Sequence, residues 1–307
     1  MNKLVEHIQS RLEQLHPWLE KNKIEAYRLY DHQLEEYSFV AEVYLDRLHI
    51  QISESNDGNN VSSDSLMKMF HSEFGFELNN IYVKNRKQQK GKSQYQKVGS
   101  RNKKFVVNEY GNLFYINLLD YFDTGLFLDH REARLSIGKD SRKKSVLNLF
   151  AYTGSFSVYA GKKGASRIVT VDTSNTYLEW AKENFTLNRI ALEKHSFIKK
   201  DAILYLEEFA KHKKETFDII IIDPPTFSNS KSRKKSFEIK RDHVELINNA
   251  LSILNDDGFI FFSTNFRKFK LNETLLNSNN IKDVTKNTSA FDFDDSPFLR
   301  YSYEIRK

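Results

Sequence analysis

The spacing of hydrophobic residues changes along the first 120 positions from a helical to a strand-like pattern. Leu4, Ile8, Leu12, Leu15 and Leu19 recur every three or four residues, which predicts an amphipathic helix at the start of the chain. Aromatic and β-branched runs then predict antiparallel strands at 27–30, 40–44 and 48–52. The pattern continues with a short helix at 66–74 and strands at 81–83, 105–107 and 113–117. We therefore expect a small α+β domain at 1–118.

Beyond residue 140, short apolar strands alternate regularly with amphipathic helices. We expect strands at 146–150, 167–171, 196–198, 217–222 and 259–263. Helices are expected to begin near Ser155, Thr176, Ala202 and Arg241. Because this alternation is typical of a parallel sheet that is covered on both faces, it predicts a doubly wound α/β domain at 119–307. A chain of 307 residues is long enough for both domains.

The composition is that of an ordinary soluble protein, with 39% hydrophobic and 29% charged residues. No stretch approaches the roughly 18 apolar residues that a membrane helix needs. The first residues, Met1 to His7, include acidic and polar side chains where a secretory signal would have an apolar run. We therefore expect a cytoplasmic protein that neither spans a membrane nor is anchored to one.

The chain contains no cysteine, and this absence limits its chemistry. Disulfides, thiolate metal sites and mechanisms that need a thiolate nucleophile are excluded. We expect no metal ion at the functional site. A group transfer by this protein must proceed without a covalent cysteine adduct.

Nine basic residues and no acidic residue lie between positions 84 and 104. Such a segment can neutralise a phosphate backbone, in keeping with the net charge of +6. The predicted RNA contacts are Lys84, Arg86, Lys87, Lys90, Lys92, Tyr95 and Lys97. The alternative interpretation is a solvated basic loop without a partner, and base composition of the genome alone can raise the lysine content.

Polar residues follow the first three predicted strands of the α/β domain, where such sheets bind their ligands. The first strand leads into a turn with a single glycine, Gly154, whereas a dinucleotide site would have three. Asp172 follows the second strand, 24 residues after Asn148, at the distance expected for a carboxylate that binds ribose hydroxyls. Asp201 follows the third strand and suits either an adenine amino group or the N-cap of a helix. The series favours S-adenosylmethionine over a dinucleotide.

The fourth strand runs directly into Asp223-Pro224-Pro225-Thr226-Phe227. Two consecutive prolines end a strand and remove two amide donors, which leaves carbonyl groups and one carboxylate at its end. Phe227 suits stacking on a nucleic acid base, and burial beneath the sheet is the alternative.

These segments resemble the RlmK-type family of 23S ribosomal RNA guanine-N7 methyltransferases, which in many bacteria form the C-terminal half of a bifunctional enzyme. The resemblance is carried by residues 26–31, 89–92, 94–97, 123–131, 148–154, 176–181 and 222–231. It implies a Rossmann-like class I methyltransferase sheet behind a smaller N-terminal α+β domain. Leu299-Arg300 departs from the Ile-His expected there, and Phe266-Arg267-Lys268 is also changed.

The resemblance also implies roles for individual residues. S-adenosylmethionine would be bound by Thr124, Gly125, Phe127, Asp129, Arg131, Asn148, Tyr152, Thr153, Gly154, Asp172, Thr173, Ser174, Asp201 and Ala202. The cleft beside the methyl group would be formed by Asp223, Pro224, Pro225 and Phe227. The implied partner is 23S rRNA or a ribosome assembly intermediate, and a separate methyltransferase is expected to replace the missing fused half.

Methylation of guanine N7 needs neither a covalent intermediate nor an obligatory base, because this nitrogen has an in-plane lone pair. Alignment of the nucleophile, methyl carbon and sulfur at roughly 3 Å contact supplies the catalysis. One alternative is methylation of an exocyclic amine of adenine or guanine, although the aromatic residue of that motif usually follows the prolines directly and here Thr226 intervenes. The other is a noncatalytic factor that remodels rRNA.

Overall fold

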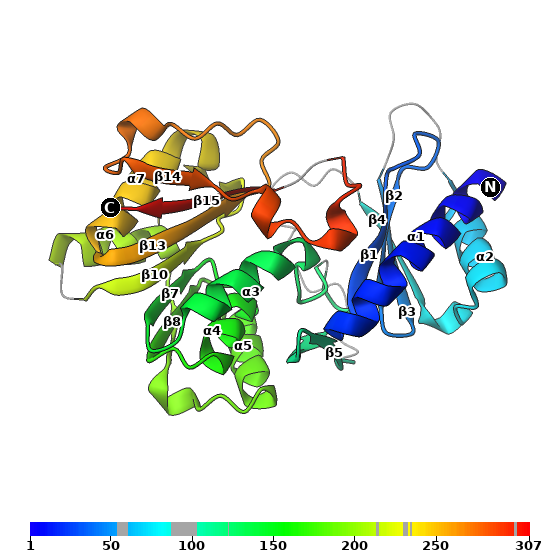
Figure 1. Ribbon diagram of the computed structural model, residues 1–307, viewed down its shortest axis with the longest axis horizontal. Helices are drawn as coiled ribbons and strands as arrows, with labels where there is room; N and C mark the ends of the chain where they lie inside the picture. The colour runs from blue at the N-terminus through cyan, green and yellow to red at the C-terminus, as the bar shows by residue number, and fades with distance from the viewer. Residues whose placement is uncertain are drawn as a thin grey trace. The chain divides into compact units, whose positions relative to one another are not determined.

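The structure is a computed structural model that describes residues 1–53, 61–86, 103–121, 123–212, 215–229, 233, 235–297 and 300–307. The chain divides into two compact units (Figure 1). Unit 1 comprises Met1–Leu128 and Ala290–Phe298, and unit 2 comprises Asp129–Ser289 and Leu299–Lys307. The separate roles predicted for residues 1–118 and 119–307 stay predictions.

Unit 1 is built on a four-stranded sheet with the order β1-β2-β3-β4 among its described residues. The strands are β1 (Ala26–Asp31), β2 (Phe39–Tyr44), β3 (Arg47–Ser53) and β4 (Ile81–Arg86). The first three are antiparallel, as predicted, and β4 runs parallel to β3. The parallel connection contains helix α2 (Ser63–Phe74) and the 3-10 helix η1 (Leu78–Asn80).

One face of this sheet is covered by α2 and by helix α1 (Asn2–Asn22). Leu4, Ile8 and Leu15 of α1 are fully buried there, which confirms the helical spacing in the sequence. The opposite face contains a buried polar pair. Glu42 of β2 and His49 of β3 are cross-strand partners, and both alternate along their strands with residues of the apolar core. A hairpin of β5 (Phe105–Glu109) and β6 (Asn112–Ile116) completes the strands of this unit.

Unit 2 contains the predicted doubly wound sheet, with the order β14-β15-β13-β10-β7-β8-β9 in the part of the chain that is described. Five parallel strands are β7 (Ser145–Leu149), β8 (Arg167–Asp172), β9 (Ser196–Lys199), β10 (Phe217–Ile222) and β13 (Leu254–Thr264). The antiparallel edge consists of β14 (Asn280–Asp283) and β15 (Tyr301–Arg306). From β7 the chain moves outward to β9 and then returns to β10 on the other side, so the strand order switches between β7 and β10.

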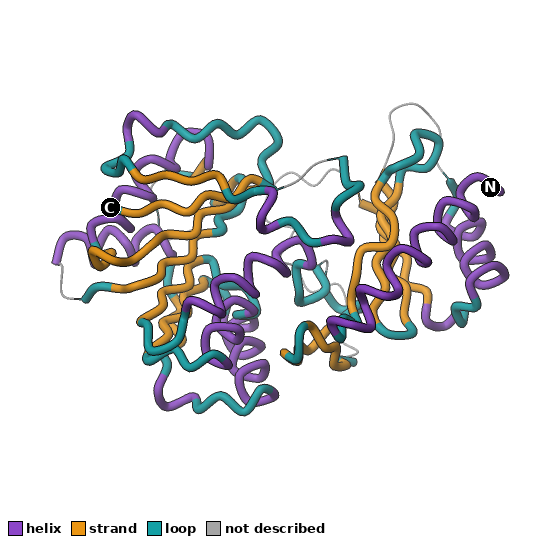
Figure 2. The backbone as a smooth tube through the Cα atoms, in the orientation of Figure 1, coloured by secondary structure: helices purple, strands orange, loops and turns teal. Residues whose placement is uncertain are grey.

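Helices cover both faces of this sheet (Figures 1 and 2). One face carries α3 (Arg131–Asp140), α4 (Ser155–Lys162) and α5 (Asn175–Leu187), and the other carries α6 (Ala202–His212) and α7 (Ile239–Ser252). Leu147 and Leu149 of β7 point toward α6 and α7, whereas Asn148 between them bonds to Ser157 of α4. The sheet is buried on both sides, as its apolar strands predict.

Further short elements lie between the larger ones. A two-stranded ribbon pairs β11 (Phe227–Ser228) with β12 (Phe237–Glu238). The short 3-10 helices are η3 (Leu128–His130), η4 (Leu192–Lys194), η5 (Glu273–Leu275), η6 (Lys286–Thr288) and η7 (Phe291–Phe293). The last of these belongs to unit 1, where Asp292 accepts a hydrogen bond from the amide of Arg28 at 2.9 Å.

Candidate functional site

The carboxyl ends of four parallel strands of unit 2 lie level with one another. The register pairs Ile222 of β10 with Leu149 of β7 and with Phe262 of β13, and it pairs Leu149 with Val171 of β8. The residues that follow these strands are therefore brought to one edge of the sheet, across the switch in strand order. This is where doubly wound sheets bind ligands.

Asp223 follows β10 at this edge, and three side chains hold its carboxylate. One oxygen, Oδ1, accepts hydrogen bonds from Ser263 Oγ at 2.7 Å and from Arg300 Nη1 at 3.1 Å. The other, Oδ2, lies 2.9 Å from His130 Nε2. Ser263 lies in β13, Arg300 directly precedes β15 and His130 lies in η3, so tertiary structure fixes the orientation of Asp223.

The charges around Asp223 decide its protonation state. Burial raises the pKa of Asp223, but the charges of Arg300 and His130 and the hydrogen bonds from His130 and Ser263 more than offset it and hold this pKa well below its usual range. The carboxylate is thus an anion, and His130 Nε2 must be the donor in their hydrogen bond. A carboxylate with such a low pKa is a poor proton acceptor.

Asp129 lies beside Asp223 and shares Arg300 with it. Arg300 Nε and Nη2 both donate to Asp129 Oδ2, at 2.9 and 2.7 Å. Burial raises the pKa of Asp129, but the charges of Arg300 and His130 and the hydrogen bonds from Arg300 together outweigh it and lower this pKa. Arg131, the next predicted residue, is the fully buried first residue of α3.

The turn between β7 and α4 has a strongly bent backbone. Phe150 and Tyr152 adopt positive φ angles of 55° and 51°, which side chains other than glycine adopt rarely, and Gly154 follows with φ 72°. The Tyr152 amide donates to Asp172 Oδ2 at 2.9 Å, and the Ser174 amide donates to Oδ1 at the same distance. The predicted turn and the predicted ribose-binding carboxylate are therefore in direct contact.

Asp172 differs from Asp223 in its electrostatic environment. Burial raises the pKa of Asp172 to about 6, and the amides of Ser174, Tyr152 and Thr173 offset this only in part. Backbone amides donate to both carboxylate oxygens, and the carboxylate has the capacity to accept further hydrogen bonds. The side chain is half-buried and suits a ligand with paired hydroxyl groups.

Two predicted cofactor residues have clear structural roles. A Cβ atom on Gly154 would lie 2.8 Å from Ala181 Cβ, so this glycine permits α4 and α5 to approach closely. Asn148 donates to Ser157 Oγ at 2.9 Å and is buried in the interface with α4. These contacts explain why a glycine and an asparagine stand at these two positions. Contact of either residue with a cofactor stays a prediction.

Asp201 acts as the helix cap that the sequence allowed. Its Oδ1 accepts from the amide of Ile203 at 3.0 Å, and its Oδ2 pairs with Arg233 Nε at 2.9 Å. Ala202 is buried in the first turn of α6. A role in adenine binding stays a prediction.

The remaining predicted cofactor residues near these turns are Thr153, Thr173 and Ser174. Ser174 caps α5 and accepts from the Tyr177 amide at 3.4 Å, and Thr173 beside it is exposed. Thr153 is buried, and its carbonyl accepts from Asn184 Nδ2 at 3.0 Å. They lie in or beside the turns that follow β7 and β8.

Thr124, Gly125 and Phe127 belong to unit 1. Thr124 is buried, and its hydroxyl lies 2.9 Å from the hydroxyl of Tyr44, which in turn donates to Glu42 at 2.9 Å. Burial raises the pKa of Glu42, but the charge and hydrogen bonds of Arg28 and the contacts to His49 together outweigh it and lower this pKa to about 2. A buried anion thus orders the loop that contains Thr124.

The motif after Asp223 presents one exposed aromatic ring. Pro224 is buried and Pro225 half-buried, whereas Phe227 is 48% exposed. The alternative of a buried Phe227 is therefore excluded. Phe227 lies in β11, and the neighbouring Thr226 hydroxyl donates to Asn265 at 3.1 Å.

Most of the predicted RNA-binding segment lies outside the described residues, including Lys87, Lys90, Lys92, Tyr95 and Lys97 and the side chain of Arg86. Lys84 lies in β4, and its ammonium donates to the carbonyl of Tyr121 at 2.6 Å. Burial lowers the pKa of Lys84 to about 8, against the raising effect of Asp123, Glu42 and Asp120. Lys84 is thus engaged within unit 1.

The sequence did not single out three residues that hold Asp223: His130, Ser263 and Arg300. His130 lies inside a segment that carries the family resemblance, and Arg300 was visible only as a departure from it. Both are separated from Asp223 by more than 70 residues in the chain, so no local spacing could connect them.

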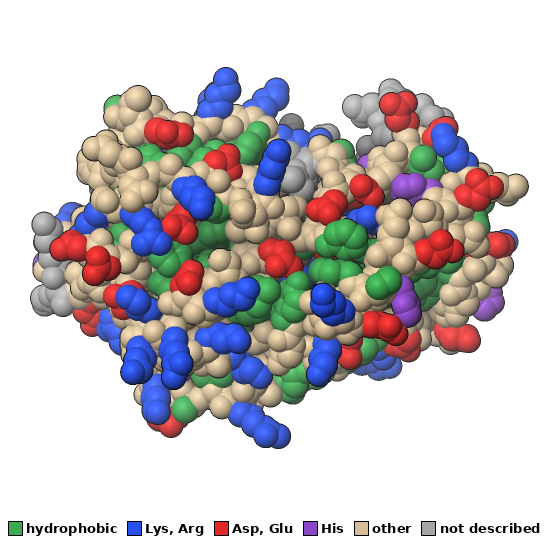
Figure 3. Space-filling model, in the orientation of Figure 1, with side chains coloured by type: hydrophobic (Ala, Val, Ile, Leu, Met, Phe, Trp, Pro, Cys, Tyr) green, Lys and Arg blue, Asp and Glu red, His purple; other side chains and the backbone are tan. Residues whose placement is uncertain are grey.

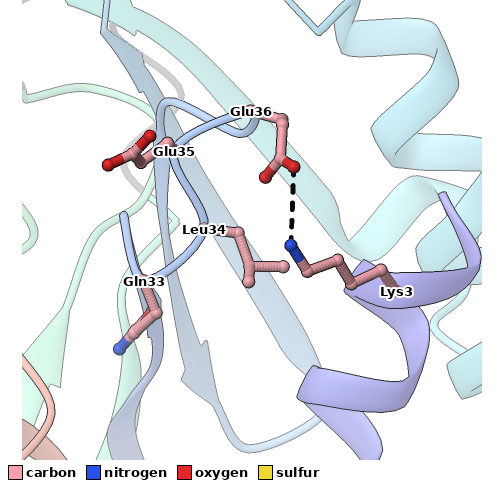
Figure 4. A pocket seen from close by; sticks show the side chains of 5 residues that line it. All are labelled: Lys3, Gln33, Leu34, Glu35 and Glu36. Carbon is pink, nitrogen blue, oxygen red and sulfur yellow. Dashed lines mark hydrogen bonds and ion pairs between the residues drawn. The ribbon is translucent and has the colours of Figure 1, made fainter.

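A hollow in unit 1 is lined by exposed and half-buried side chains and contains no buried carboxylate like those of the candidate site. It measures about 330 Å³ and lies in unit 1 beside the turn after β1, where Lys3 and Glu36 form an exposed ion pair (Figure 4). Among the described residues, no three His, Asp or Glu side chains are close enough to hold a metal ion. No helix in the described part of the chain is both long and apolar enough to cross a membrane.

Comparison with known proteins gives relatives over most of the chain. The family model for S-adenosylmethionine-dependent methyltransferases matches residues 81–296. Ribosomal RNA large subunit methyltransferase K of Neisseria meningitidis is 40% identical over 300 residues, which cover 96% of this chain and 84% of that protein. Ribosomal RNA large subunit methyltransferase K/L of Colwellia psychrerythraea is 42% identical over 302 residues, and the match covers 94% of this chain but only 41% of the relative.

Solved structures show the same fold at low sequence identity. A methyltransferase named SMU.776, complexed with SAH, aligns with a TM-score of 0.76 and 22% identity over 99% of this chain and 81% of that one. The protein aTrm5, solved with tRNALeu, aligns with a TM-score of 0.53 and 15% identity over 96% of this chain and 75% of that one. The sheet of unit 2 is accordingly a Rossmann-like class I methyltransferase sheet.

Proposed function

This chain belongs to the S-adenosylmethionine-dependent methyltransferase family, and we propose that it methylates N7 of a guanine in the 23S rRNA of the large ribosomal subunit. The names of relatives with 40% and 42% identity support large-subunit rRNA as the substrate. The family resemblance in the sequence supports the guanine and its atom.

The residues at the sheet edge fit the cofactor of this family. Asp172, with its acceptor capacity at the switch in strand order, would hold the ribose hydroxyls, and Asp129 would lie toward the methionine end. When bound, S-adenosylmethionine supplies a methyl group on a positively charged sulfur. The anionic carboxylates of Asp129 and Asp223 make this edge favourable for a cation.

The three partners that engage the Asp223 carboxylate are the observation that carries the choice of atom. Guanine N7 uses an existing lone pair and loses no proton, whereas an exocyclic amine must give up a proton after methylation. Asp223 is held as an anion by Arg300, His130 and Ser263 and is poorly suited to accept that proton. It therefore favours N7 over the amine, and we assign Asp223 to orienting Pro224, Pro225 and Phe227 around the base.

Exposed basic residues support an RNA partner within the described part of the chain. Lys139, Arg142, Lys143, Lys162 and Lys163 are exposed at the ends of α3 and α4 and in the turns that follow them. The two turns are adjacent, because the Lys143 amide donates to the Gly164 carbonyl at 2.8 Å. Figure 3 shows Lys and Arg side chains gathered over this part of unit 2. Such a surface suits a phosphate backbone, and it lies at the amino ends of β7 and β8, at the sheet edge opposite the candidate site.

The test is to incubate the purified protein with labelled S-adenosylmethionine and rRNA that lacks the modification, and to identify the product nucleoside by mass spectrometry. We expect 7-methylguanosine, and none with Asp223→Ala. A product methylated on an exocyclic amine would replace the N7 assignment, and the absence of any product would contradict methyl transfer to rRNA.

A further inference from the structure

Arg300 bridges the two carboxylates of the candidate site. Its Nε and Nη2 converge on Asp129 Oδ2 at 2.9 and 2.7 Å, and its Nη1 reaches Asp223 Oδ1 at 3.1 Å. Only 11% of the Arg300 side chain is exposed. All three residues belong to unit 2.

We infer that Arg300 is a positioning residue for methyl transfer, which keeps Asp129 and Asp223 ionised together and fixes their distance from each other. This inference rests on the proposed function. Its physical reason is that two neighbouring buried carboxylates repel each other, so that one of them takes up a proton unless a cation lies between them. A site with one protonated carboxylate would attract a cationic cofactor less well and would hold the Asp-Pro-Pro turn differently.

Within the described residues, the charged groups that contact Arg300 or its partners lie on η3 and in the turn after β10. η3 contributes Asp129 and His130, the turn after β10 contributes Asp223, and β13 contributes the uncharged hydroxyl of Ser263. The pKa of both carboxylates is lowered against the effect of burial, and Arg300 is the largest cause of the lowering in each case. Burial lowers the pKa of Arg300, but Asp129 and Asp223 more than compensate and raise it.

The geometry requires arginine as well as a positive charge. Two nitrogens of the guanidinium point to one carboxylate and the third points to the other, a planar fork that an ammonium group cannot reproduce. Arg300→Lys therefore keeps the charge and loses the fork, whereas Arg300→Met keeps the length and loses both.

The first experiment uses the protein without ligand, so it does not depend on the reaction. Urea unfolding of wild type, Arg300→Met and Arg300→Lys is measured from pH 5 to pH 8. In Arg300→Met the folded-state pKa of one carboxylate rises above its unfolded value, so stability is lost as pH rises. The ratio of the unfolding constant of Arg300→Met to that of wild type should therefore rise roughly tenfold per pH unit, until the pH exceeds that raised pKa. Arg300→Lys should show little widening.

Arg306→Met is the matched control, because Arg306 lies in β15, which begins directly after Arg300, and pairs with Glu304 at 2.8 Å at the surface. Its gap to wild type should be the same at every pH. A gap for Arg300→Met that is equally independent of pH would overturn the inference and leave Arg300 a packing residue. If Arg300→Met is unfolded at pH 8, a folded protein at pH 5 supports the inference. A variant that is unfolded at both pH values overturns it.

The second experiment measures steady-state methyl transfer across the same pH range. The kcat of Arg300→Met should fall at least tenfold at pH 6 and recover toward wild type as pH rises, whereas Arg306→Met should follow wild type. Added methylguanidinium should restore part of the kcat of Arg300→Ala, which leaves the space of the arginine side chain open. Unchanged kcat in Arg300→Met at every pH would overturn the positioning role. If wild type itself transfers no methyl group, the proposed function fails, and the unfolding series still decides whether Arg300 keeps both carboxylates ionised.

Discussion

His130 Nε2 donates a hydrogen bond to Asp223 Oδ2 across 2.9 Å, although 93 residues separate the two in the chain. His130 ends the 3-10 helix η3 directly before α3. Its ring packs edge-on against the ring of Phe156 in α4, with 5.2 Å between the two ring centres. The imidazole is thus held on one side by an apolar contact and on the other by a buried anion.

Replacing His130 should weaken both the site and the fold. Removal of a donor to a buried carboxylate costs about 1–3 kcal/mol, so His130→Ala should lower the free energy of unfolding by that amount and kcat/KM by about tenfold or more. His130→Gln keeps an N–H donor and should recover part of both. Urea unfolding and methyl-transfer assays measure the two effects, with the exposed His212→Gln as control. Equal effects of His130→Ala and His130→Gln would argue against the hydrogen bond.

Asp172 should make cofactor affinity depend on pH. Its pKa of about 6 lies above the unfolded value, so its ionisation costs folding stability as pH rises from about 4 through 6. Only the ionised form accepts two ribose hydroxyls well, and affinity for S-adenosylhomocysteine should therefore fall up to about tenfold per unit below pH 6. Calorimetry from pH 5 to pH 8 tests this. Asp172→Asn should bind more weakly at pH 8 and show little dependence on pH; a steep dependence that persists in this variant would assign it to another group.

Gly154 should be far less replaceable than a glycine with a similar backbone angle. Gly154→Ala strains a φ of 72° and places Cβ 2.8 Å from Ala181 Cβ, and these effects together should cost about 2–4 kcal/mol. Gly164 has φ 85° and a Cβ added there would meet nothing within 4 Å, so Gly164→Ala should cost only about 1 kcal/mol. Thermal or urea unfolding compares them. Equal costs would mean that α4 moves away from α5 without penalty.

Phe227 should contribute to RNA binding without affecting the cofactor. Its ring is 48% exposed beside the candidate site, and stacking on a base contributes about 1–3 kcal/mol. Phe227→Ala should therefore weaken the apparent affinity for rRNA about fivefold to a hundredfold, Phe227→Trp should keep it, and affinity for S-adenosylhomocysteine should stay unchanged. Filter binding and calorimetry separate the two. Loss of cofactor affinity in Phe227→Ala would place the ring in the cofactor site.

The regular elements of both units could be predicted from the sequence because their apolar spacing is local information. The five parallel strands of the doubly wound sheet were predicted within a few residues, apart from the early start of β13 at Leu254. Helix α3 was not predicted, because Arg131 and Arg134 are fully buried and interrupt the expected apolar stripe. The antiparallel strands β14 and β15 were missed as well, although Tyr303 and Ile305 of β15 alternate with Glu304 and Arg306 as in a half-buried strand.

The candidate site likewise contains residues that local sequence patterns predict and residues that they do not. Asp172 and Asp223 could be predicted because they directly follow strands whose parallel order brings their ends together. The partners that set their charge could not, because Arg300 and Ser263 reach Asp223 through the order of strands β15 and β13 in the sheet. Local spacing contains no information on such pairs.

The most direct test of N7 methylation is chemical cleavage of cellular rRNA. Borohydride and aniline cut RNA at 7-methylguanine, so rRNA from a strain that lacks this protein should lose one cleavage in 23S rRNA. The wild-type gene should restore that cleavage, and Asp223→Ala should not. An unchanged cleavage pattern in the strain without the protein would contradict guanine N7 as the target.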